Sequence, residues 1–277
     1  MKYYALISGL PEISLDDAKL PFSVQAFKKE LNEVLSSKDK KLVDGLFLKY
    51  DNENLLEYLR KKEAELNNKG TIAPEELADM VLEIKEVEKP LNKNIPPYFL
   101  DFVRDYLQGE EALYNLFWED QLSSLYYDFL LKSPNKFIRE WAEFNLNINN
   151  VLIALSSRRN GKQYIPYIVG HNEVAETIRT SNARDLGLSE IFEQYEEVRR
   201  IDEEPNLIER ERKIDELRWN WIEEVNFFNY FTIEKVIGFL LKLQMVERWT
   251  SLNEEKGKEI FHELVDNMRK GVTNMKS

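Results

Sequence analysis

The chain has 277 residues, of which 43% are hydrophobic and 32% are charged, and its formal net charge at pH 7 is −12. This composition is typical of a folded protein with highly charged helix faces and excludes a disordered chain, while the acidic balance predicts no nucleic-acid partner and no non-specific binding to anionic lipid. The sequence contains no Cys, which excludes disulfides, thiol nucleophiles and thiolate metal sites, and its few Gly and Pro residues favour long helices.

Apolar residues recur with the 3.6-residue period of amphipathic helices along the first half of the chain. Ser23 is predicted to cap the first such helix and Asp51 the next, while Pro74 occupies the first turn of a third. Residues 98–131 are predicted to be helical with a break near Gly109, and their many aromatic residues indicate a core. The first half is therefore predicted to be helical throughout.

The second half continues the helical pattern. Ser133 and Pro134 are predicted to begin a long helix, and Pro205 separates two further helices in an acidic stretch. Thr232 and Asn253 are predicted to cap the last two helices. Only YYALIS (residues 3–8) and YIPYIV (residues 164–169) alternate in a way that is typical of strands. Within the acidic stretch begins an apolar repeat of seven residues, at Leu207, Ile214, Trp221 and Phe228, which predicts a long amphipathic helix with a buried apolar face.

The N-terminus and the apolar runs predict a cytosolic protein. Residues 3–10 are apolar, but no small-residue cleavage site follows them. The longest apolar runs, such as residues 236–241, are far shorter than the ~20 residues of a membrane-spanning helix. Any membrane association is therefore expected to occur only through a partner.

One sequence pattern occurs twice. Residues 51–59 and 147–155 both follow [DN]-x-x-N-[LV]-L-x-x-L. In each copy the first residue is predicted to be an Asx N-cap that precedes an apolar helix face. Chance similarity between two helix starts and an internal duplication both explain the pattern.

No catalytic motif is complete in the sequence. Residues 261–266, FHELVD, begin like the zinc-protease signature H-E-x-x-H but end in Asp266, and Glu259 with His262 forms only half of a di-iron motif. The other histidine, His171, lies in VGHN, and Gly161 lacks the earlier Gly of a phosphate-binding loop. We therefore expect no catalytic residue, no metal site and no cofactor. A carboxylate-dependent hydrolase is an alternative that only the abundance of Asp and Glu supports.

The segment EFNLNINNVLIALSSRRNGKQYIPYIVG, residues 143–170, combines Asn residues, an apolar run, a basic cluster and a Tyr/Pro/Gly stretch. Its cations are expected at a helix C-terminus, where they complement the carbonyl dipole, and Gly161 is expected to end the helix in a left-handed conformation. A further role in docking an acidic partner is a hypothesis. The predicted partner-binding residues are Arg158, Arg159, Lys162, Tyr164 and Tyr167.

The order of these parts resembles the C/d subunit of archaeal and vacuolar-type rotary ATPases. Residues 231–242 also resemble a late helix of that family. In the segment itself, YIVG (residues 167–170) follows Pro166, where that family has a pair of glycines. The N-terminal YYALISGLPEISLDD and PFSVQAFKKEL are similar to an uncharacterised bacterial family encoded in V-type ATPase operons, over most of the chain. Within the segment, the resemblance rests on Asn147, Asn150, Val151, Leu152, Arg158, Arg159, Gly161, Ile165, Pro166 and Gly170.

The resemblance implies an all-α, funnel-like multi-helix bundle of two or three similar helical lobes, without an active site or a cofactor. Residues 1–277 would form a single all-α domain with lobes at 1–95, 96–187 and 188–277. The implied function is that of a non-catalytic subunit or assembly factor of a bacterial V-type ATPase, which couples the central stalk to the membrane proteolipid ring in ion transport. Its partners would be the other ATPase subunits. It would be cytoplasmic, and the ATPase complex would hold it at the periphery of the inner membrane. A general helical adaptor protein is the other alternative.

Overall fold

All regular structure in the described part of the chain is helical. The computed structural model describes residues 3–61, 66–86, 95–108 and 117–274, and the side chains of these residues except those of Glu86 and 254–274. Eleven α-helices, one 3-10 helix and no strand occur in these ranges. The two segments that alternate like strands are helical too, as α1 (Tyr4–Ser8) and η2 (Ile165–Tyr167). The predicted all-α class is confirmed.

Contacts between residues group the chain into two compact units. Unit 1 consists of Met1–Ser36 and Asp215–Ser277, and unit 2 of Ser37–Ile214. Helix α10 (Leu207–Val225) passes from one unit into the other. The division into three lobes stays a prediction.

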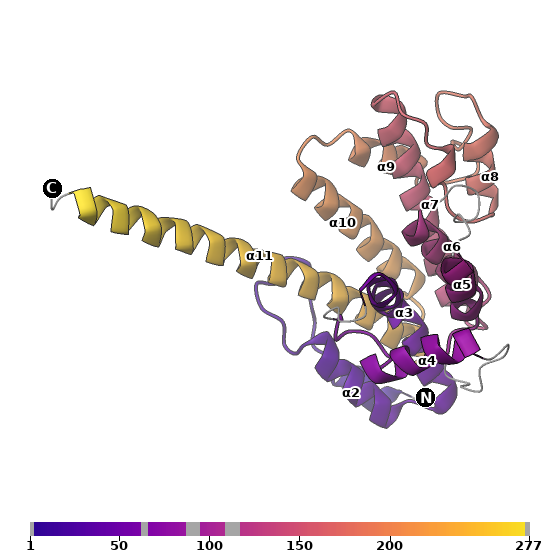
Figure 1. Ribbon diagram of the computed structural model, residues 1–277, viewed down its shortest axis with the longest axis horizontal. Helices are drawn as coiled ribbons and strands as arrows, with labels where there is room; N and C mark the ends of the chain where they lie inside the picture. The colour runs from indigo at the N-terminus through magenta and orange to yellow at the C-terminus, as the bar shows by residue number, and fades with distance from the viewer. Residues whose placement is uncertain (1–2, 62–65, 87–94, 109–116, 275–277) are drawn as a thin grey trace. The chain divides into compact units, whose positions relative to one another are not determined.

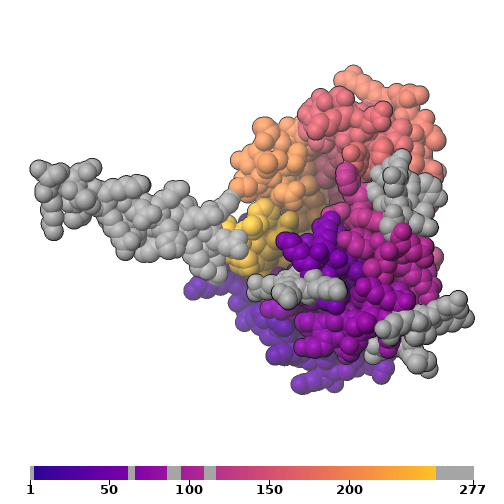
Figure 2. Space-filling view, viewed as in Figure 1, coloured from indigo at the N-terminus to yellow at the C-terminus, as the bar shows by residue number. Residues whose placement is uncertain are grey.

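In unit 1, α2 (Val24–Val34) packs against α11 (Ile233–Asn274), and the two segments lie side by side in Figures 1 and 2. The Oγ of Ser23 accepts a hydrogen bond from the backbone N–H of Ala26 at 3.1 Å, so the predicted N-cap is confirmed. The ring of Phe27 in α2 meets that of Phe239 in α11 edge-on, with 5.2 Å between the centroids. Aromatic packing thus joins α2 to the first part of α11 in one core.

A buried carboxylate secures α10 to α11 within unit 1. Asp215 is 1% exposed and accepts a hydrogen bond from the indole N–H of Trp249 at 2.9 Å. Its carboxylate also pairs with Arg248, and with Arg218 at 3.2 Å. Because a buried charge is costly unless it is paired and hydrogen-bonded, these three partners together explain how Asp215 is accommodated.

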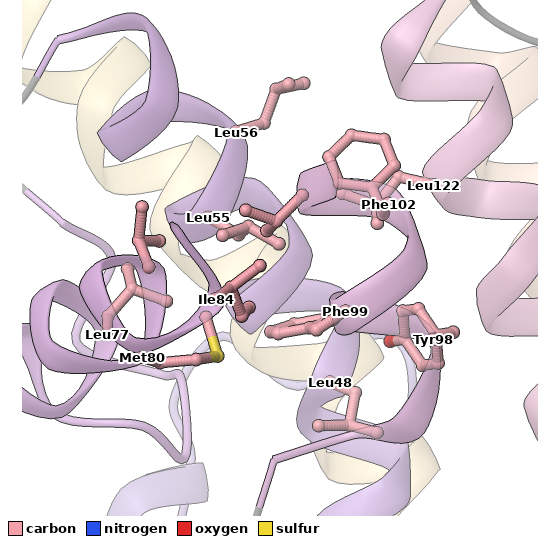
Figure 3. Packing of buried hydrophobic residues seen from close by; sticks show 12 residues of the cluster. Leu48, Leu55, Leu56, Leu77, Met80, Ile84, Tyr98, Phe99, Phe102 and Leu122 are labelled. Carbon is pink, nitrogen blue, oxygen red and sulfur yellow. The ribbon is translucent and has the colours of Figure 1, made fainter. Parts of the chain in front are cut away.

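Unit 2 contains α3 (Ser37–Arg60), α4 (Pro74–Glu86), α5 (Pro97–Gln108) and α6 (Trp118–Leu131), which share one hydrophobic cluster. Pro74 is the first residue of α4, as predicted. Figure 3 shows side chains of α3, α4 and α5 converging, with Phe99 of α5 fully buried between them. The apolar face of α4 is buried, since Leu77, Met80, Val81 and Ile84 all belong to the cluster.

The second half of unit 2 is built around α7 (Lys136–Arg159), which packs against α6, α8 (Glu173–Thr180) and α9 (Tyr195–Asp202) (Figure 1). The N-cap of α7 is Asn135, whose side chain accepts from the N–H of Ile138 at 3.1 Å, and not the predicted Ser133. The predicted break between α9 and α10 at Pro205 is confirmed.

Several predicted helix limits and faces are wrong. Helix α11 runs through Asn253 without a new start. Leu207 and Phe228 are 63% and 79% exposed, although Ile214 from the same heptad is buried. Leu207 begins α10, and Phe228 follows its last residue, Val225. The seven-residue spacing therefore extends beyond α10 to Phe228, where it no longer defines one face of a helix. The predicted break at Gly109 lies outside the described residues.

Candidate functional site

The two copies of the repeated pattern hold loops in the same way. The side-chain Oδ1 of Asn54 accepts from the backbone N–H of Asn67 at 2.7 Å, and its Nδ2 donates to the carbonyl of the same residue at 2.9 Å. Asn150 makes the same pair of bonds with Val169, at 2.9 and 2.8 Å. Both side chains are buried in the middle of a long helix, α3 or α7. We call these two arrangements the loop clamps.

The first residue of each copy also reaches forward to the next helix. The Oδ1 of Asp51 accepts from the N–H groups of Thr71 and Ile72 at 2.7 and 3.0 Å, shortly before α4 begins. Asn147 accepts from the side chain of Asn172 at 2.7 Å, and Asn172 is the N-cap of α8. Neither Asp51 nor Asn147 caps its own helix, so that prediction is wrong. Instead, each ties its helix to the start of the following one.

A glycine follows the clamped residue in both loops, and in both the space beside it is closed. A Cβ on Gly70 would lie 2.6 Å from Oδ1 of Asp51 and 2.8 Å from Nδ2 of Asn54. A Cβ on Gly170 would lie 2.8 Å from a methyl group of Leu146, and this glycine also has a left-handed φ of +78°. The two segments thus share an Asn clamp, a forward contact and a nearby glycine with no room for a side chain.

The predicted basic cluster lies at the C-terminal end of α7, where Gly161 has the expected left-handed φ of +63°. The guanidinium of Arg158 donates to the hydroxyl of Tyr164 at 2.7 Å, and to the carbonyls of Ser181 and Ala183 at 3.1 and 2.6 Å. These bonds join the end of α7 to the segment that follows α8. Arg158 and Tyr164 therefore order the loop from within the chain.

Arg159 has an internal partner as well. Its guanidinium donates to the backbone carbonyl of Asp202 at 2.7 Å and pairs with the carboxylate of the same residue at 2.9 Å. The carboxylate is buried at the end of α9, whereas the arginine side chain is 46% exposed. This pair holds α9 against α7. Partner binding by Arg158, Arg159 and Tyr164 stays a prediction. All three side chains already form hydrogen bonds within the chain.

The other two predicted residues, Lys162 and Tyr167, lie on an exposed surface. The ring of Tyr167 stacks on that of Phe117, with centroids 6.0 Å apart and planes 20° from parallel. Phe117 and Ile165 are 62% and 52% exposed. A hollow of about 580 Å³ adjoins them, and its lining includes Lys162 and Tyr167. We call Phe117, Lys162, Ile165 and Tyr167 the docking surface.

Sequence patterns missed two members of the docking surface. Phe117 stands in the aromatic-rich stretch that predicted a core, but it is the residue just before α6 and its ring lies outside. Ile165 belongs to the short η2 turn. Ile165 could have been suspected only as an apolar residue near the helix end predicted at Gly161, and no sequence signal marked Phe117. Their exposure depends on how the neighbouring elements pack.

One titratable group in the hollow is perturbed. Burial raises the pKa of Asp120 above its ordinary value, and the negative charge of neighbouring Glu119 raises it further. Asp120 is the only carboxylate among the described residues that line the hollow. A carboxylate-dependent hydrolase would need two converging carboxylates, and this hollow does not provide them from its described lining.

Residues 1–272 match a family model whose description is "Protein of unknown function (DUF2764)". The chain belongs to this family. No curated protein and no solved structure matches it. The match to DUF2764 spans the loop clamps and the docking surface in unit 2 as well as most of unit 1. A relation of this DUF2764 chain to the C/d subunit of rotary ATPases stays a prediction from the sequence resemblance.

The histidines and acidic residues of this DUF2764 chain form no metal site in the described ranges, where no three His, Asp or Glu residues are grouped so as to hold an ion. The side chain of His262, in the incomplete zinc and di-iron motifs, lies outside the described residues. His171 is exposed, with its Nδ1 3.3 Å from the carboxylate of Glu176. Across the described residues, no helix combines the length and the apolar character that a membrane crossing requires.

Proposed function

We propose that the chain is a non-catalytic subunit or assembly factor of a bacterial V-type ATPase, which helps to couple the central stalk to the membrane proteolipid ring in ion transport. The loop clamp of α7 carries this proposal. The resemblance to the C/d subunit rests in part on Asn147, Asn150 and Gly170. Asn150 bonds the loop to the helix, Asn147 bonds the start of α8 to it, and Gly170 leaves room for Leu146. An equivalent clamp on α3 supports the repeated helical lobes that the resemblance implies.

The clamped loop also supports a role in binding. It carries Lys162, Ile165 and Tyr167, and it is held on one side by Asn150 and on the other by Arg158. Exposed aromatic and aliphatic side chains on an ordered loop lose little conformational entropy when a partner covers them. The exposed ammonium of Lys162 favours an acidic rim on that partner.

The partners in this proposal are other subunits of the ATPase. The chain would lie in the cytoplasm at the inner membrane and would reach the membrane through these subunits. Chemistry at the nucleotide would be done by those partners. This fits a binding surface that consists of stacked rings and one cation.

The proposal is tested by co-purification from the native host, with an affinity tag on another ATPase subunit. Wild-type chain should be recovered with the complex, and Phe117→Ser with Tyr167→Ser should lower its recovery by about tenfold or more, as expected when two interface aromatics are lost. Leu207→Ser with Ile208→Ser is the matched control, because these residues are also exposed and apolar. Thermal unfolding followed by circular dichroism would verify that both double variants fold.

Gene deletion completes the test. Loss of the chain should reduce ATPase assembly or ATP-driven ion pumping. The proposal would be refuted if the purified complex lacked the chain and if the deletion left both assembly and pumping intact. A chain that binds a different protein through the docking surface would be a general helical adaptor.

A further inference from the structure

A second exposed aromatic surface lies in unit 1, at the turn between α10 and α11. Phe227, Phe228 and Tyr230 are 66%, 79% and 62% exposed. Tyr4 is 55% exposed and adjoins the same turn, since its ring centroid lies 4.8 Å from that of Phe231. We call Tyr4, Phe227, Phe228 and Tyr230 the aromatic tip.

The turn that carries the aromatic tip is internally ordered. The backbone N–H of Phe227 donates to the carbonyl of Glu224 at 3.1 Å, and that of Asn229 donates to the carbonyl of Asn226 at 3.0 Å. The side chain of Asn229 also donates to the side-chain oxygen of Asn226 at 3.1 Å. The rings are therefore presented on a turn that needs little further ordering when it binds.

The amount of exposed apolar surface is large for a single turn. An aromatic side chain has about 150–250 Å² of surface, so four rings at these exposures present roughly 500 Å². This is comparable to the largest apolar patches on typical monomers, about 300–600 Å². Residues 226–233 contain no charge, although 32% of the chain is charged. Such a surface indicates a binding partner.

Charges around the aromatic tip decide which partner fits. Glu223 and Glu224 are exposed in the last turn of α10, and Glu234 lies in the first turn of α11. Glu234 and Lys235 are both half-buried, and the side chain of Lys242, which pairs with Glu223, is 17% exposed against 52% for Glu223. The rim is therefore acidic at its surface. It repels nucleic acid and anionic lipid and attracts a basic surface.

A second copy of the chain fits less well. A symmetric contact between two tips would bring their glutamates together, and like charges in contact repel. We propose that the aromatic tip inserts into an apolar groove of a different protein, with Lys or Arg residues on the rim of the groove. This surface is distinct from the docking surface, whose exposed Lys162 favours an acidic partner.

The test is site-specific photo-crosslinking in the native host with the full-length chain. p-Benzoylphenylalanine replaces Phe228 in one strain and Leu207 in a control strain, because both side chains are exposed and apolar. A protein should be linked at position 228 and not at position 207. Mass spectrometry of the linked peptide should place the attachment in an apolar groove with Lys or Arg residues beside it. The aromatic probe preserves the character of the tip, so the labelled chain is expected to fold.

Charge reversal then tests the rim. Glu224→Lys should lower the crosslinking yield at position 228 on the order of fivefold, since a rim charge steers association. Glu209→Lys, an exposed site elsewhere on α10, should leave the yield unchanged. An unchanged yield in Glu224→Lys would overturn the proposal. So would linkage to lipid, linkage to a second copy, or linkage no greater than at position 207.

The result is independent of the ATPase assignment. A basic-rimmed partner outside the ATPase would support the aromatic tip as a docking site, while co-purification alone would decide the proposed function. Conversely, a chain that co-purifies with the ATPase but fails the crosslinking criteria would retain the proposed function and lose this second site.

Discussion

Replacement of Asn150 by Leu tests the loop clamp of α7. Leu has nearly the shape of Asn but cannot form hydrogen bonds, so the substitution removes both bonds to the backbone of Val169. Val169 is 7% exposed, and its N–H and C=O groups would be left buried without these partners. Each lost bond contributes about 1 kcal/mol, and each unsatisfied buried group costs about 1–3 kcal/mol. We expect the free energy of unfolding to fall by about 2–5 kcal/mol.

The other clamp supplies a matched control. Asn54→Leu removes the same pair of bonds, but Asn67, whose backbone it holds, is exposed and can bond to water instead. We expect a loss of only about 1–2 kcal/mol there. The assay is urea unfolding at 25 °C followed by circular dichroism, with the denaturant slope compared between the variants. A loss below about 1 kcal/mol for Asn150→Leu, or equal losses for both variants, would refute the reasoning.

Two further substitutions test packing and ionisation. Burial raises the pKa of Tyr98 above its ordinary value, whereas tyrosine in the unfolded chain ionises near pH ~10. Because ionisation then favours the unfolded chain, the free energy of unfolding should fall as the pH rises above that value. Tyr98→Phe, which loses the bond to Asn52, should cost about 1–2 kcal/mol at pH 7, and in urea titrations the difference from wild type should shrink at pH 11. A Cβ on Gly238 would lie 2.2 Å from Nδ2 of Asn226. Gly238→Ala should therefore destabilise the folded chain by about 1–3 kcal/mol, despite the better helix propensity of Ala. An increase in the melting temperature would contradict this.

Helix starts that rest on local interactions could be predicted from the sequence. Ser23 bonds to a backbone N–H three residues away, and Pro74 needs only its fixed φ and its missing N–H in a first turn. Gly161 likewise has the left-handed conformation expected after a helix with a cationic end. In each case the favourable interaction lies within a few residues, so the pattern of residue types contains the information.

The same kind of pattern is misleading at Asp51 and Asn147. An Asx side chain can cap its own helix, and this local interaction is the one that the pattern predicts. In the structure these side chains bond to groups 20 or more residues away, as in the contact from Asp51 to Thr71. The heptad likewise places Phe228 on a buried face, because a seven-residue spacing can be counted past the end of a helix.

The sequence by itself determined that this protein is all-α, where some of its helices begin, and that a pattern is repeated at residues 51 and 147. These features follow from residue periodicity and from interactions between near neighbours. The tertiary structure alone decided that the repeated Asn residues clamp distant loops and that the rings of Phe117 and Phe228 face outward. The physical reason is that burial and long-range hydrogen bonds depend on which elements pack together, and a local pattern does not specify that packing.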